Sequence, residues 1–178
     1  YNAAWRVTDI FKNLFFSYLI VLLPLMSVAF ARSLDALKHR CNISIKYLTI
    51  ITVPTAAGLS VLAPRLVRLI YGHEFDAAAP VLQTLIWTVC LFCIVLVFAH
   101  VLVASHNQIL DLVANVAALA INLVCGALLI PRYGPLGAGV ATLVSLAAFG
   151  AIEYSMVARR LFVPDVVGPF LRAGAASL

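Results

Sequence analysis

The sequence predicts an all-α, polytopic transmembrane helix bundle with about five spanning helices. Five stretches carry no formally charged side chain; one runs 34 residues and the others run 18 to 20. They are Asn13–Ala31, Tyr47–Pro64, Ala77–Leu110, Leu112–Pro131 and Tyr133–Ile152. At about 1.5 Å per helical residue, roughly 20 residues match the hydrocarbon core of a bilayer. Hydrophobic residues make up 64% of the chain and charged residues 11%, whereas a soluble domain carries about a quarter charged residues.

The connections set the expected bounds of the spans. We expect a bundle over residues 1–165, with spans at about 10–31, 47–70, 79–104, 109–130 and 136–158. The segment Arg32–Lys46 is rich in basic residues with scattered apolar ones, which predicts that it lies along the membrane interface. Pro54, Gly58 and Pro64 predict that the second span is bent or locally unwound.

Two polar breaks divide the second half of the chain. Without the break at Ser105–Gln108, the 34-residue stretch would form one helix about 50 Å long. The turn Pro131–Pro135 separates the fourth span from the fifth. In the fifth span a stripe of small residues predicts close helix packing; it consists of Gly137, Ala141, Ser145 and Ala148.

Both ends of the chain suggest an internal piece of a longer, transporter-sized protein. The chain does not begin with Met, and its first residues already have a helical pattern. Residues 166–178 turn apolar again, so we expect a cytoplasmic tail or the start of a truncated further helix.

The basic residues indicate an orientation in the membrane. They lie mostly at span ends, where lipid headgroups and the positive-inside rule account for them, so the net charge of +5 does not indicate nucleic-acid binding. Placing Arg32–Lys46 in the cytoplasm puts seven basic residues on that side and five on the other. We therefore expect a multi-pass protein of the cytoplasmic membrane with residue 1 outside and the tail inside.

The sequence carries no signature of an enzyme. It has no nucleophile motif, no metal-ligand cluster and no phosphate-binding glycine loop, so we expect no catalytic residue, cofactor or metal. Cys90 and Cys93 have a spacing that suggests metal or redox chemistry in soluble proteins. They lie among Leu, Ile, Val and Phe, where cysteine behaves as a small hydrophobe.

The fourth span carries a polar stripe on one helical face. Its members recur at steps of three or four residues and are Asp111, Asn115, Ala118, Asn122 and Gly126. An unsatisfied amide in hydrocarbon is costly, so Asn115 and Asn122 face another helix or a wet cavity. They either bond between helices or line a polar transport path.

Other polar residues near membrane depth have two interpretations as well. We expect His100 to face the bundle in a hydrogen bond, with a proton-relay role as the alternative. Asp111 and Glu153 are acids on different helices near the inner surface. The basic residues of the outer half, Arg6, Lys12, Arg65 and Arg68, either reach lipid headgroups or bind an anionic lipid-linked substrate through its pyrophosphate.

The turns, taken together, resemble those of a known transporter family. The series runs from Leu23-Pro24-Leu25-Met26-Ser27 through Leu69-Ile70-Tyr71-Gly72-His73-Glu74-Phe75 to Leu129-Ile130-Pro131-Arg132-Tyr133-Gly134-Pro135-Leu136-Gly137-Ala138. It is similar to the polysaccharide-exporting, O-antigen type of flippase in the multidrug/oligosaccharidyl-lipid/polysaccharide exporter superfamily. The resemblance covers most of the chain.

The resemblance implies the second half of a protein with two six-helix bundles, mapped to roughly its eighth through twelfth helices. Such a protein moves undecaprenyl-pyrophosphate-type oligosaccharides across the membrane by alternating access around a cationic cavity. Its partners are membrane lipid, the lipid-linked oligosaccharide and the missing N-terminal bundle. Arg6, Lys12, Arg65, Arg68, Asn115 and Asn122 are the expected substrate-binding residues.

Three other classes remain open on the sequence. A drug/cation antiporter of the same superfamily requires a carboxylate at mid-depth, which these spans do not offer. A membrane glycan polymerase or acyltransferase requires a large outer loop, whereas the outer turns here are short. A purely structural membrane subunit is the third.

Overall fold

A computed structural model describes residues 20–72 and 79–165 of the chain. The described residues form helices and contain no strand, which confirms the all-α class. The helices are Ile20–Arg32, α2 (Leu34–Tyr71), α3 (Ala79–Ala104) and α4 (Gln108–Arg160). Within the described residues, α2, α3 and α4 are long and apolar enough to cross a membrane by length and composition.

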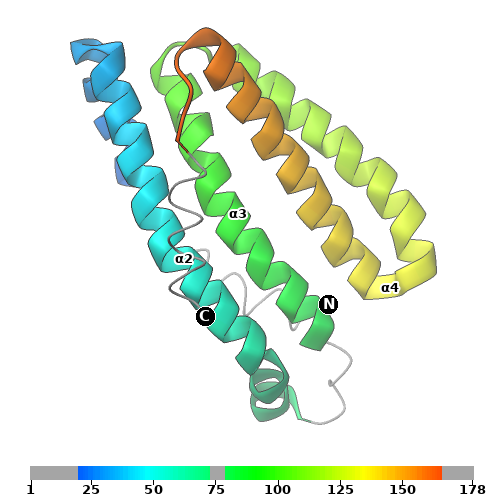
Figure 1. Ribbon diagram of the computed structural model, residues 1–178. Helices are drawn as coiled ribbons and strands as arrows, with labels where there is room; N and C mark the ends of the chain where they lie inside the picture. The colour runs from blue at the N-terminus through cyan, green and yellow to red at the C-terminus, as the bar shows by residue number, and fades with distance from the viewer. Residues whose placement is uncertain (1–19, 73–78, 166–178) are drawn as a thin grey trace.

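The helix α4 is a hairpin of two arms. Gly134 interrupts it with φ 56° and ψ −134°, a conformation with positive φ that favours glycine. The chain reverses there, so that residues 108–133 form the first arm and residues 135–160 return beside it (Figure 1). These arms correspond to the fourth and fifth expected spans, and the reversal falls within the expected turn Pro131–Pro135.

The helix α3 lies at the centre, between α2 and α4 (Figure 1). It has the bounds expected for the third span, and it carries much of the buried core. The second arm of α4 runs in the same direction as α3. Three successive contacts along the pair establish this direction: Gly139 with Thr84, Gly150 with Val95, and the rings of Tyr154 and Phe98, whose centroids are 5.9 Å apart.

Small residues allow this close packing. Gly137, Ala141 and Ser145 of the expected stripe are buried. Gly139 and Gly150 make the close approaches to α3; a Cβ atom at Gly150 would come within 2.7 Å of Cγ2 of Val95.

The segment Arg32–Lys46 differs from the prediction. The first helix ends at Arg32, and Ser33 caps the next one: its hydroxyl accepts a hydrogen bond from the backbone N–H of Ala36 at 3.1 Å. From Leu34 a single helix continues into the second span, so this segment is not separated from that span, and its position along the membrane interface stays a prediction. The physical reason is an apolar stripe at helical spacing, Leu37, Cys41, Ile45 and Leu48, which is buried against the bundle.

Of the two forms expected for the second span, bent or locally unwound, local unwinding is wrong. Within the described residues α2 is helical through both Pro54 and Pro64. Membrane helices tolerate proline where a neighbour satisfies the freed carbonyl group. In this chain α3 supplies one such donor, the side chain of Gln83.

Candidate functional site

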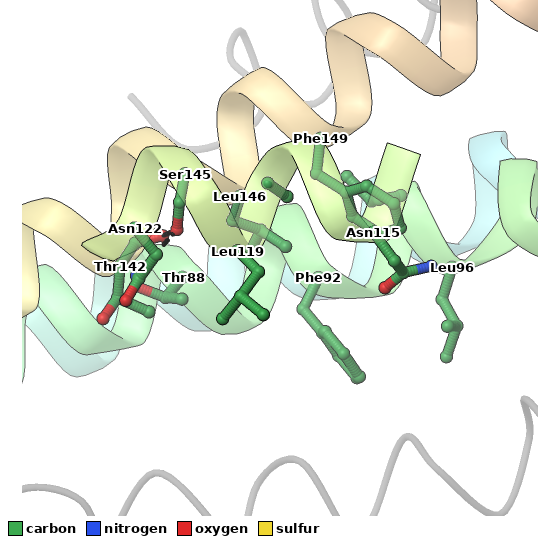
Figure 2. A pocket seen from close by; sticks show the side chains of 12 residues that line it. Thr88, Phe92, Leu96, Asn115, Leu119, Asn122, Thr142, Ser145, Leu146 and Phe149 are labelled. Atoms are coloured by element: carbon green, nitrogen blue, oxygen red, sulfur yellow. Dashed lines mark hydrogen bonds between the residues drawn. The ribbon is translucent and has the colours of Figure 1, made fainter. Parts of the chain in front are cut away.

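A cavity of about 330 Å³ lies between α3 and the two arms of α4 (Figure 2). Apolar side chains form most of its wall, and the polar groups that line it come from all three segments: Thr88, Asn115, Asn122, Thr142 and Ser145. The structure therefore brings two of the sequence-predicted site residues, Asn115 and Asn122, into one cavity.

Asn122 connects the arms of the hairpin. Its Nδ2 atom donates to Oγ of Ser145 at 2.9 Å, and that hydroxyl donates to the backbone carbonyl of Thr142 at 3.0 Å. Figure 2 shows these three side chains together at one end of the cavity. Asn122 thus makes the interhelical bond while also lining the cavity.

Asn115 lies at the other end of the cavity and bonds within its own arm. Its Nδ2 atom donates to the backbone carbonyl of Asp111 at 3.0 Å and to Oδ1 of Asp111 at 3.2 Å. The side chain is exposed in the described structure. Asn115 is therefore held in place by hydrogen bonds within its own arm.

A second cavity, of about 310 Å³, adjoins the first. The two share Asn115 and three apolar residues, and the second is also lined by His100 and Asp111. Nδ1 of His100 forms a short hydrogen bond with the backbone carbonyl of Leu96. His100 is thus hydrogen-bonded within its own helix, as expected, and it lines a mostly apolar cavity together with Asp111 and Asn115.

Glu153 is a functional candidate that the sequence did not indicate. It lies on the second arm with an exposed fraction of 0%, and neither carboxylate oxygen has a hydrogen-bond partner in the described structure. The carboxyl group of Asp111, on the first arm, lies close enough to interact with it electrostatically. The two acids were placed on separate helices from the sequence, and the hairpin brings them together.

The basic candidates lie elsewhere. Arg6 and Lys12 fall outside the described residues. Arg65 and Arg68 are exposed near the C-terminal end of α2, and neither lines the cavity that holds the two asparagines. Gln83 of α3 contacts α2 at Ser60, so both arginines lie toward the hairpin tip at Gly134.

The paired cysteines belong to the core. Cys90 and Cys93 are buried free thiols on α3. Sγ of Cys90 lies 3.3 Å from Oγ1 of Thr52, which gives α2 and α3 a polar contact. This placement agrees with cysteine acting as a small apolar residue.

The cavity chemistry suits neutral hydrogen-bonding groups. Amides and hydroxyls both donate and accept, as sugar hydroxyls do. A pyrophosphate requires Arg or Lys, which do not line this cavity. Beside it, the first arm exposes large apolar side chains, including Leu112, Leu119 and Leu128, each at least 60% exposed. Such a face suits lipid or a further helix.

Comparison with known proteins identifies the family. The family model described as "Lipid II flippase MurJ" matches residues 1–173. The chain belongs to this family. Its members are transporters, not enzymes, and the resemblance to lipid-linked oligosaccharide flippases is confirmed.

A curated relative supports the same assignment. The "Probable low-salt glycan biosynthesis flippase Agl15" of Haloferax volcanii is 27% identical over 150 residues. The match covers 83% of this chain and 31% of the relative, so the chain spans about a third of the length of that protein. No solved structure matches. As a member of a flippase family with several apolar helices, the chain is a multi-pass membrane protein.

Proposed function

We propose that the chain is part of a flippase that moves a polyprenyl-pyrophosphate-linked oligosaccharide across the cytoplasmic membrane. The observation that carries the proposal is the family match over nearly the whole chain. The family is named for lipid II, and the relative for glycan biosynthesis. We take a lipid-linked glycan as the substrate class that fits both names.

The hairpin cavity supports a role in contact with the glycan. Neutral hydrogen-bonding groups line this cavity between the apolar helices; they belong to Asn115, Asn122, Thr142 and Ser145. Sugar hydroxyls can exchange hydrogen bonds with such groups. We assign Asn115 and Asn122 to this contact, since both line the cavity and lie two turns apart on one arm.

The pyrophosphate needs cationic partners. Arg65 and Arg68 are exposed toward the hairpin tip, and guanidinium groups bind phosphate oxygens through paired hydrogen bonds. Together with Arg6 and Lys12 they are the residues we assign to the pyrophosphate. In this assignment the basic residues bind the charged pyrophosphate, and the cavity residues bind the neutral glycan.

Alternating access is the mechanism that fits this division. We propose that the exposed apolar face of the first arm of α4 meets lipid or a second bundle, and that rocking of the two bundles exposes the cavity to each side in turn. The hairpin would move as one body, because Asn122 and Ser145 bond its arms together. In this scheme residue 1 lies outside and the tail in the cytoplasm.

The test is rescue of transport in living cells. The complete transporter that carries this chain is placed in two strains, one depleted of its lipid II flippase and one lacking its O-antigen flippase. The appearance of lipid-linked glycan in the outer leaflet is then measured. Rescue of either strain supports the proposal, and failure in both, with correct membrane insertion, contradicts it.

Variants in the rescuing strain test the residues. Arg65→Ala with Arg68→Ala is expected to lower export at least tenfold, and so is Arg6→Ala with Lys12→Ala. The matched control is Arg159→Ala with Arg160→Ala, which removes two exposed arginines from the end of α4 distant from the tip. Equal export by the test and control pairs would refute the pyrophosphate assignment.

A further inference from the structure

Asp111 and Glu153 face each other across the hairpin at the end distant from the tip. Asp111 is in the first turn of α4, and Glu153 lies about two turns before its end at Arg160. The bond between Asn122 and Ser145 fixes the register that places these two residues near each other, and neither carboxyl oxygen of Glu153 has a hydrogen-bond partner in the described structure.

The surroundings of Glu153 disfavour a carboxylate. The side chain is fully buried, and an ion in an apolar, unpaired position loses its hydration without compensation. Glu153 is therefore the member of the pair that is stable as a neutral acid.

The surroundings of Asp111 are more polar. It lies in the first turn of α4, where the backbone N–H groups and the positive end of the dipole stabilise negative charge. It is partly exposed, and Nδ2 of Asn115 donates to its Oδ1 atom at 3.2 Å. Carboxyl pairs whose environments differ in this way divide into one acid and one anion.

We propose that Asp111 and Glu153 form a proton-binding site in which the protonated acid of Glu153 donates to the carboxylate of Asp111. The bound proton then joins the two arms of the hairpin at the end opposite Gly134. Loss of that proton leaves two like charges near each other, one of them on the fully buried Glu153, which pushes the arms apart. This site adjoins the assigned glycan contact at Asn115, and the proposal does not depend on the proposed function.

The neighbouring titratable groups fit this assignment. From α3, His100 lines the cavity that Asp111 borders, and its Nδ1 atom is engaged with the carbonyl of Leu96. From the helix Ile20–Arg32, the apolar Leu23 lines the same cavity. On α4 the ring of Tyr154 packs against Phe98. In the described structure none of these groups is hydrogen-bonded to Glu153.

The test is infrared difference spectroscopy of the complete transporter in lipid nanodiscs, with pH as the variable. A protonated carboxylic acid has a C=O stretching band that an ionised one lacks, and the readout requires no transport. We expect such a band at neutral pH, its loss on alkaline titration, and its absence in Glu153→Gln. Asp111→Asn should shift the band and its titration, because the hydrogen-bond acceptor changes.

A matched control separates this site from the other acids. Asp35→Asn alters an exposed acid in the first turn of α2, and it should leave the band and its titration unchanged. Circular dichroism shows whether each variant is folded; Glu153→Gln keeps the shape of the side chain and so retains its packing.

Three results would overturn the proposal. The first is the absence of a protonated-acid band at neutral pH in the unmodified protein. The second is a band that Asp111→Asn leaves unchanged, since the proton would then not be shared. The third is disappearance of the band on adding sodium at constant pH, which would assign the pair to a metal cation.

Discussion

The side-chain amide of Gln83 donates to the backbone carbonyl of Ser60 at 2.9 Å. Ser60 lies four residues before Pro64, so its carbonyl is the one that Pro64 leaves without a helical donor. The helix α3 thus repairs a gap in α2, and α2 stays helical through the proline. This bond also fixes the register of α2 against α3.

Replacing Gln83 should therefore destabilise the bundle. Gln83→Leu leaves the Ser60 carbonyl without a partner, which we expect to lower the free energy of unfolding by about 1–3 kcal/mol. The measurement is denaturant unfolding in detergent micelles. In a Pro64→Ala background the backbone N–H is restored, so the same substitution should cost less than half as much. An equal cost in both backgrounds would contradict this account of the bond.

The bond between Asn122 and Ser145 should appear as a coupling energy between the arms. A double-mutant cycle of Asn122→Ala and Ser145→Ala is expected to give about 0.6–1.7 kcal/mol, the range of hydrogen bonds between membrane helices. Asn115→Ala is the matched control, because Asn115 bonds within its own arm. Its coupling to Ser145→Ala should be near zero. Similar coupling for both asparagines would mean that the arms are not joined at Asn122.

Two glycines in helices should respond oppositely to alanine. At Gly150 a Cβ atom meets Cγ2 of Val95, so Gly150→Ala should destabilise the protein by about 1–3 kcal/mol through overpacking. A Cβ at Gly58 meets nothing within 4 Å, so Gly58→Ala should stabilise α2 by about 0.5–1 kcal/mol. Adding Val95→Ala should recover part of the loss at Gly150. Thermal unfolding of the four proteins gives the comparison.

The hairpin reversal depends on Gly134. Its φ of 56° is one that side chains with a Cβ atom rarely adopt, so Gly134→Ala should cost about 1–3 kcal/mol. Gly126→Ala is the control, since its Cβ would make an ordinary contact at 3.6 Å with Cδ1 of Ile130. Unfolding of both variants by denaturant is the measurement. Equal stability of the two variants would show that the turn tolerates a side chain.

The sequence predicted α3 and the hairpin tip well because their signals are local. The apolar run of α3 is bounded by polar residues on both sides, and its helix has the predicted bounds. The reversal at Gly134 follows from a glycine between two prolines. The sequence interpretation does not predict that α2 begins at Leu34. It gives the charged residues of this segment more weight than its apolar stripe, Leu37, Cys41 and Ile45. That stripe was visible as an i, i+4 pattern.

The pairing of polar residues between the two arms of the hairpin could not be predicted from local sequence signals. The register of the hairpin brings Asn122 to Ser145 and Asp111 to Glu153. That register depends on contacts between segments distant in sequence. Helical periodicity placed Asn115 and Asn122 on one face and so identified the cavity side of the first arm. It contains no information on which residues of the second arm lie opposite.

We infer that these helices cross a membrane in alternation, with the Gly72 corner and the hairpin tip on the same side. Substituted-cysteine accessibility tests it most directly, in a protein whose native cysteines are replaced by alanine. We expect an impermeant thiol reagent to label Gly72→Cys and Arg132→Cys from one face of the membrane and His106→Cys from the other. Labelling of Gly72→Cys and Arg132→Cys from opposite faces would contradict the account.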